Sequence, residues 1–308
     1  MTFRRVVRDV GYAIIGQTDD LAPADRRLYA IRDVTGSVES IPLMASSILS
    51  KKLAEGLDGL VIDVKTGSGA LLADATASRM LAETIVAIAN GAGVRTRALI
   101  TDMDAVLGHA VGNALEVAEA VDYLTGGARD PRLHDVVSSL AAEMLVLGNL
   151  AATLSEAQAK LQTRLEDGSA AETFARMVAA LGGPTDFLER HDSYLPRAPV
   201  VRPCLAERSG FIATMETRQI GIAAINLGGG RRHAGDGIDP AVGFAQVRGI
   251  GSAIAAGEPL AMVHAANEAD AAAAIAALRQ ALAIAEAPPS VPPVVHARID
   301  AARQVKVA

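Results

Sequence analysis

Strand-like apolar runs alternate with helical stretches through residues 60–124, and this alternation leaves few folds open to the chain. Leu60-Val61-Ile62-Asp63-Val64 is typical of a buried parallel strand, and residues 94–100 form a second run of this kind. Helical spacing of apolar residues follows each run, over residues 76–89 and 112–124. Because parallel strands need crossover connections, the pattern predicts an α/β domain whose parallel or mixed sheet is covered by helices.

Four segments are predicted along the chain. The apolar run between Val10 and Ile15 indicates a buried strand, so residues 1–20 are interpreted as a remnant strand of the α/β domain. Residues 21–58 form a segment of a helical lobe, and residues 59–199 form the α/β domain. Short strands between glycine-rich turns make residues 200–308 a smaller, β-rich α+β lobe.

Further elements follow from periodicity and from helix-end signals. Helices are expected over residues 133–147, 155–166, 170–181 and 268–286. Ser155 with Gln158 fits a capping box at the start of the second of these helices. Four prolines between residues 288 and 293 predict an extended tail.

Composition excludes several classes of protein. Lys plus Arg number 29 and Asp plus Glu 35, a net charge of −6 without a basic cluster, which argues against general nucleic-acid binding. Cys204 is the single cysteine, so no internal disulfide is expected, and a small buried residue is a better interpretation than a nucleophile. The histidines show no spacing typical of a transition-metal site. No apolar run approaches the ~20 residues of a membrane span, and no signal peptide is recognised, so a cytoplasmic location without membrane contact is expected.

Residues 40–55 are predicted to form a helix that ends before Gly56. Helical spacing places Ser47 and Lys51 one turn apart on one face, where both side chains can contact one small polar ligand. Arg32, from the preceding segment, adds a planar cationic donor. The residues alone leave another interpretation open, because exposed ion pairs are common and lysines near a helix C-terminus are expected from the macrodipole.

Two glycine-rich turns suggest anion binding and also have simpler interpretations. The run from Asp63 to Gly69 lacks the spacing of a nucleotide phosphate loop, so a tight strand-to-helix turn is the better prediction. Gly228-Gly229-Gly230-Arg231-Arg232 offers backbone N–H groups and positive charge to an anion, but a flexible turn is at least as good an interpretation.

Motifs spread over nearly the whole chain, among them Ala22-Pro23-Ala24-Asp25 and Gly112-Asn113-Ala114-Leu115-Glu116, closely resemble those of the thymidine and pyrimidine-nucleoside phosphorylase family. The matching segments are residues 13–18, 22–25, 28–35, 46–58, 63–70, 89–94, 112–117, 183–187 and 228–232. There is one large departure. The family's phosphate-binding loop contains a Lys-His-Ser-Thr-Gly-Gly run that does not occur here, so the chain resembles a member that lacks about the first third.

The resemblance implies a pyrimidine-base site. Family residues that match Arg32, Ser47 and Lys51 bind the base, with Arg32 and Lys51 as the catalytic cations that stabilise the leaving pyrimidine. Leu71 stands where relatives often carry a phenylalanine, which removes an aromatic edge against the base. The positions that the resemblance adds to the substrate site are Tyr29, Met44, Ile48 and Leu71.

The implied activity is the reversible phosphorolysis of thymidine to thymine and 2-deoxy-α-D-ribose 1-phosphate, with phosphate as co-substrate and no organic cofactor. The resemblance also implies a homodimer. A potassium ion would be held by positions matching Leu107, Ala110 and Glu119, which offer hard oxygen ligands. Without the phosphate loop the chain alone is expected to be inactive. The alternatives are a broad pyrimidine-nucleoside phosphorylase and a non-catalytic truncated or split-enzyme fragment.

Overall fold

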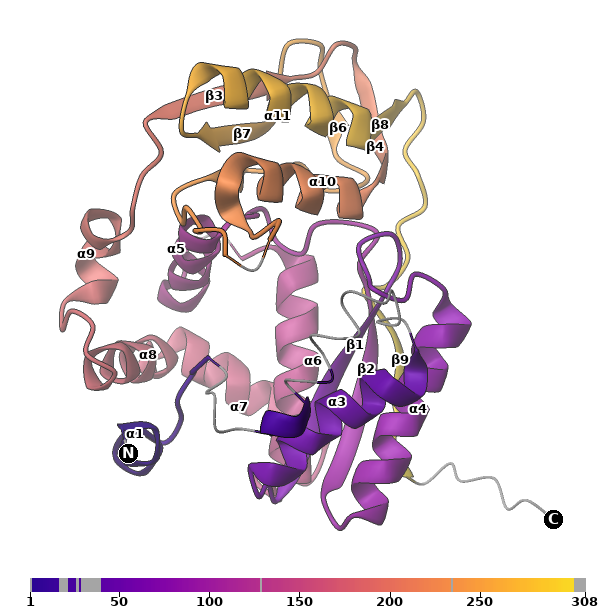
Figure 1. Cartoon of the computed structure of the whole chain (residues 1–308), viewed down its shortest axis with the longest axis vertical. Helices are drawn as coiled ribbons and strands as arrows, with labels where there is room; N and C mark the ends of the chain where they lie inside the picture. Colours follow the sequence, from indigo (N-terminus) through magenta and orange to yellow (C-terminus); the bar gives the residue numbers. More distant parts are fainter. Residues whose placement is uncertain are drawn as a thin grey trace. The chain divides into compact units, whose positions relative to one another are not determined.

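A computed structural model describes residues 2–16, 22–25, 28, 40–127, 129–233 and 235–301 of the 308-residue chain. The chain divides into two compact units, and Figure 1 shows their elements coloured along the sequence. Unit 1 comprises Met1–Ala13, Met103–His134 and Arg164–Pro292, and unit 2 comprises Ile14–Asp102, Asp135–Thr163 and Pro293–Ala308. These units cut across the predicted segments 59–199 and 200–308, whose boundaries stay predictions.

Unit 2 is built on a three-stranded sheet in the order β1-β2-β9. Strands β1 (Gly59–Thr66) and β2 (Arg95–Asp102) are parallel, with Gly59 opposite Arg95. Strand β9 (Val295–Ile299) pairs with β2 in the antiparallel direction. The predicted parallel pair and the α/β fold class are therefore confirmed.

Two helices of unit 2 share a core with this sheet. Helix α4 (Ala75–Gly91) packs against β1 and β2, and α3 (Ile41–Ala54) packs against α4 (Figure 1). Asp74 caps α4 by accepting a hydrogen bond from the Ala77 N–H. Leu49 of α3 and Ile85 of α4 are buried in one apolar cluster, so packing fixes which face of α3 remains for polar contacts.

Helices α6 (Pro131–Leu147) and α7 (Leu154–Glu166) are each divided between the two units. The start of α7 differs from the prediction. Thr153 Oγ1 accepts the Glu156 N–H at 3.1 Å, and the Glu156 carboxylate accepts the Ala152 N–H at 2.9 Å. The capping interaction thus lies two residues before the predicted Ser155 and Gln158, because Thr153 and Glu156 offer the same chemistry at the helix's real first turn.

Unit 1 contains two small antiparallel sheets with orders β3-β7-β5 and β6-β4-β8, and its core includes Phe244, Ile212 and Leu278. Helix α11 packs against α10, β3 and β7 (Figure 1). Cys204 of β3 is fully buried, as its interpretation as a packing residue requires. The strands are β3 (Val200–Leu205), β4 (Gly210–Met215), β5 (Gly243–Ala245), β6 (Ala253–Ile254), β7 (Pro259–Ala265) and β8 (Leu282–Ala285). The helices are α1 (Thr2–Val10), α5 (Asn113–Thr125), α8 (Ser169–Ala180), α9 (Phe187–Tyr194), α10 (Thr217–Ala224), the π-helical turn η1 (Ile225–Gly229) and α11 (Glu268–Ala281).

The predicted strand between Val10 and Ile15 is wrong. Helix α1 extends to Val10, residues 11–16 have no regular structure, and Ile14 is 66% exposed. Val6 is fully buried and α1 packs against α8, so the apolar residues of this region serve a helix face. A short apolar run does not by itself distinguish strand from helix, and only strand pairing would have settled it.

One prediction near the C-terminus also needs correction. The helix predicted to reach residue 286 ends at Ala281, and residues 282–285 form β8, which pairs with β4. Pairing with a neighbouring strand overrides the helical preference of this alanine-rich stretch. The tail after the four prolines is extended as predicted, since it forms β9, whose exposure alternates along Val295–Ile299 as expected of an edge strand.

Candidate functional site

Helix α3 brings Ser47 and Lys51 together, as their spacing predicts. Lys51 Nζ donates a hydrogen bond to Ser47 Oγ at 3.2 Å, and Ser47 is 6% exposed. Buried Ala45 and Leu49 anchor the neighbouring face of the helix in the core. Gly56, just after the helix, has a φ of +70°, a left-handed conformation that suits glycine at this position.

The structure adds Asp25, to which sequence reasoning assigned no role. Lys51 Nζ lies 2.8 Å from Asp25 Oδ2, and the two side chains are 23% and 10% exposed. Asp25 belongs to the Ala22-Pro23-Ala24-Asp25 motif that carries part of the resemblance. Its contact with Lys51 spans 26 residues, and no helical spacing predicts a contact of that range.

The structure describes only some of the other predicted base-site residues. Arg32 and Tyr29 lie outside the described residues, so their approach to Ser47 and Lys51 stays a prediction. Met44 and Ile48 are half-buried against the core of unit 2, and Leu71, in the turn after β1, is 45% exposed. Their role as walls for a pyrimidine base also stays a prediction.

A closed polar network occupies the C-terminal ends of β1 and β2. Lys65 Nζ lies 2.7 Å from Asp63 Oδ2 and donates to Thr101 Oγ1 at 2.9 Å, while Thr101 Oγ1 donates to Asp63 Oδ1 at 2.5 Å. The chain then turns and enters α4 at Ala75. The interpretation of residues 63–69 as a strand-to-helix turn is therefore confirmed.

A carboxylate of the chain itself occupies the backbone donors beyond the second glycine run. The N–H groups of Arg232 and His233 donate to Asp236 Oδ2 at 3.0 and 2.9 Å. These backbone hydrogen bonds, His233 first, hold the pKa of Asp236 below its usual value. An external anion would have to displace this carboxylate, which favours the interpretation of residues 228–232 as part of a turn.

Glu119 lies against the loop that carries Leu107 and Ala110, as the predicted potassium site requires. Burial raises the pKa of Glu119, although backbone N–H groups of His109 and Ala110 oppose this shift, and Glu119 Oε1 accepts the His109 N–H at 2.5 Å. Carboxylate and carbonyl oxygens suit a hard cation. The carboxylate already accepts N–H donors, however, so the potassium ion stays a prediction. Within the part of the chain that the structure describes, no group of three His, Cys, Asp or Glu side chains is placed to hold a metal ion.

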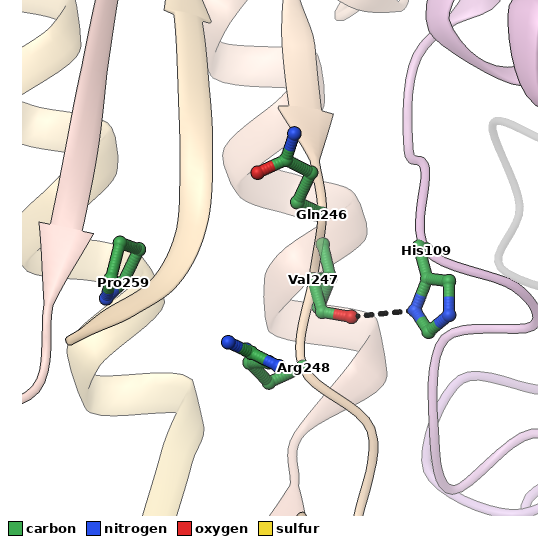
Figure 2. Close-up of a pocket in the computed structure, with 5 residues that line it drawn as sticks. All are labelled: His109, Gln246, Val247, Arg248 and Pro259. Carbon is green, nitrogen blue, oxygen red and sulfur yellow. Dashed lines mark hydrogen bonds between the residues drawn. The ribbon is translucent and has the colours of Figure 1, made fainter. Parts of the chain in front are cut away.

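Unit 1 also contains a pocket of about 330 Å³ that no motif predicted. Gln246, Val247 and Arg248 follow β5 directly, and Pro259 begins β7. Figure 2 shows the His109 imidazole turned toward the Val247 carbonyl, 3.0 Å from Nδ1, and its Nε2 lies 3.4 Å from Asp130 Oδ2. With an oxygen beside each ring nitrogen, the imidazole is held in one orientation.

Comparison with known families gives two matches. Residues 1–171 match the family described as glycosyl transferase family, a/b domain, and residues 211–285 match the pyrimidine nucleoside phosphorylase C-terminal domain. The first range contains the α3 site and Glu119, and the second contains much of the core of unit 1. Among the described helices, none is both long and apolar enough to cross a membrane.

Proposed function

We propose, because the chain belongs to the glycosyl transferase family and carries the C-terminal domain of pyrimidine nucleoside phosphorylases, that it binds thymidine and serves its reversible phosphorolysis to thymine and 2-deoxy-α-D-ribose 1-phosphate. The family is one of pentosyltransferase-type enzymes acting on a nucleoside and phosphate. The observation that carries the thymidine proposal is the Lys51–Ser47 hydrogen bond on α3, between two residues that the resemblance matches to the family's base-binding residues.

The chemistry explains why a lysine and a serine suit this site. A phosphate oxygen forms a bond to C1′ of the sugar, the glycosidic C1′–N1 bond breaks, and its electron pair remains on the pyrimidine. The negative charge spreads over the ring and its carbonyl oxygens until N1 is protonated to give thymine. A fixed ammonium group stabilises this charge more than it stabilises the neutral nucleoside, so the interaction lowers the barrier. Ser47 and, by resemblance, Arg32 add hydrogen bonds that orient the base.

A test of base recognition does not require turnover. Calorimetric titration compares thymine with 5-nitrouracil, a pyrimidine that is anionic at neutral pH and imitates the leaving base. We expect the anionic base to bind more tightly, and Lys51→Ala to weaken its binding at least tenfold, as expected for losing a hydrogen bond from a charged group. The matched control is Lys52→Ala, which removes the adjacent lysine of the same helix, paired with Glu55 instead. Equal loss in both variants, or no binding by the wild type, would refute the proposal.

Phosphorolysis needs phosphate donors in addition to the base site. The 308 residues contain no Lys-His-Ser-Thr-Gly-Gly run, so we expect the 308-residue polypeptide alone to release only traces of thymine from thymidine. Fusion to the family's phosphate-binding segment, or addition of that segment as a second chain, should restore phosphate-dependent release. Robust release by the 308 residues alone would overturn this expectation, and no release after restoration would favour a non-catalytic protein.

The thymidine preference has one direct alternative, broad pyrimidine-nucleoside phosphorolysis. The same release assay with uridine separates the two, because a thymidine-specific enzyme discriminates against the 2′-hydroxyl. Equal kcat/KM for the two nucleosides would favour the broad activity. We further propose a homodimer, as the family resemblance implies, which sedimentation measurements test directly.

A further inference from the structure

We propose that Asp25 is a positioning residue for Lys51: it holds the ammonium group beside Ser47 so that the remaining N–H points at a carbonyl oxygen of the pyrimidine. The inference rests on the proposed function, because it needs a base at the α3 site. It concerns a contact that neither the sequence nor the family matches assign.

Two hydrogen bonds are enough to fix the directions of all three N–H groups of an ammonium group. Lysine has three N–H donors arranged tetrahedrally around Nζ. One is directed to Asp25 Oδ2 at 2.8 Å and another to Ser47 Oγ at 3.2 Å. Once two of the directions are fixed, the third is fixed as well. No acceptor within the described residues receives this third N–H of Lys51, which leaves it for a ligand.

Asp25 is the stronger of the two anchors. Its contact is charge-assisted and shorter than the contact to the neutral Ser47 hydroxyl, which by itself would leave a four-carbon side chain mobile. The Asp25 and Lys51 side chains are only 10% and 23% exposed, so water competes less for the pair than at an open surface. Asp25 thus removes in advance much of the side-chain freedom that a bound base would otherwise have to restrict.

An electrostatic role and a positioning role of Asp25 predict opposite changes in the binding of an anionic base, so variants of Asp25 can distinguish the two roles. As a charge alone, Asp25 repels an anionic base, so any loss of its carboxylate would strengthen binding. As an anchor, it can be replaced by asparagine, whose amide oxygen still accepts the Lys51 hydrogen bond, but not by alanine. The conservative variant should therefore rescue what the truncated variant loses.

The experiment is calorimetric titration of the 308-residue chain with 5-nitrouracil and thymine. We expect Asp25→Ala to weaken 5-nitrouracil binding about three- to tenfold, the factor that corresponds to immobilising one long side chain. Asp25→Asn should bind as tightly as the wild type or more tightly. On a Lys51→Ala background, Asp25→Ala should cause no further loss of binding, because Asp25 acts through Lys51. Asp25→Ser, too short to reach Nζ, replaces the alanine variant should that variant unfold.

Contrary outcomes point to different failures. Stronger binding in both Asp25→Ala and Asp25→Asn would overturn the positioning role and leave only a charge effect. Additive losses in the double variant would assign Asp25 a general structural role and also overturn it. If the wild type binds neither base, the proposed function fails and the inference fails with it. Wild-type binding that depends on Lys51 but is indifferent to Asp25 removes the inference alone.

Discussion

Replacing Glu143 should destabilise unit 2 by releasing its last strand. The Glu143 side chain, on α6, is 2% exposed and accepts hydrogen bonds from Arg97 of β2, at 2.8 Å, and from Arg298 of β9. Burial opposes the charge of Arg298, but its contacts with Glu143 and Asp300 outweigh burial and raise the pKa of this guanidinium. One carboxylate thus links two arginines that come from the neighbouring strands β2 and β9.

The magnitude follows from what the substitution leaves behind. Breaking a buried ion pair by removing one partner costs about 3–5 kcal/mol, because the other charge remains desolvated. The side chains of Arg97 and Arg298 are 22% and 37% exposed, so water can partly rehydrate them. For Glu143→Ala we therefore expect the free energy of unfolding to fall by about 3 kcal/mol, the lower end of that range. For Glu143→Gln, which keeps one acceptor oxygen, we expect about half of this loss.

The assay is thermal unfolding combined with amide hydrogen exchange. A loss of about 3 kcal/mol corresponds to a fall in Tm of about 6–12 °C in a domain of this size. Because the chain forms two units, exchange of the amides of Val295–Ile299 reports β9 directly, and it should accelerate. Glu83→Ala is the control, since its contact with Arg79 is exposed and 3.8 Å long, and it should change stability by less than about 0.5 kcal/mol. Unchanged exchange of β9 in Glu143→Ala would refute the reasoning.

Three further predictions concern other parts of the chain. Burial raises the pKa of Cys204, so thiol reagents should modify it only after unfolding, and rapid modification of the native chain would contradict its burial. Folding raises the pKa of Glu119 above 4.5, so the folded state holds this proton more tightly than the unfolded state. The resulting contribution to the free energy of unfolding is complete below pH 4.5 and is lost as the pH rises through the folded-state pKa. Denaturation at a series of pH values should therefore show the wild type losing stability relative to Glu119→Gln over this window, and a constant difference would count against the shift. Gly243→Ala would place Cβ 2.0 Å from the Val111 carbonyl oxygen at a φ of +148°, so a loss of about 3 kcal/mol or more is expected, whereas Gly168→Ala, with open space around it, should lose only about 1–2 kcal/mol in urea unfolding.

The parts of the fold that the sequence predicted well are those in which local pattern and tertiary role agree. Residues 60–64 are apolar enough to be a buried strand and are paired as one. The predicted helix over residues 40–55 is confirmed as α3, because apolar spacing and a glycine after its end point to the same structure. The relation of Ser47 to Lys51 was predictable for the same reason, since the helical period alone sets it.

The failures lie where partners distant in sequence decide the local structure. Residues 282–285 suit a helix by composition and form a strand because β4 offers an edge. Val10 and Ile15 lie in a run apolar enough for a strand, yet residues 11–16 pair with no strand among the described residues. Asp25 belongs to the same class, because its contact with Lys51 depends on how the chain folds back and not on any spacing. Long-range contacts of this kind are invisible to periodicity.

The adjacent lysines of α3 show how helix phase separates a generic feature from a candidate site. Both Lys51 and Lys52 lie in the last turn, where positive charge suits the helix macrodipole, so that argument cannot distinguish them. Successive residues point about 100° apart around a helix. Lys51 consequently meets Ser47 and a shielded Asp25, while Lys52 turns to Glu55, with side chains 38% and 30% exposed. The macrodipole interpretation is adequate for Lys52. It does not explain why Lys51 is shielded and hydrogen-bonded to both Asp25 and Ser47. The proposed ligand, which accepts the third N–H of Lys51, accounts for this arrangement.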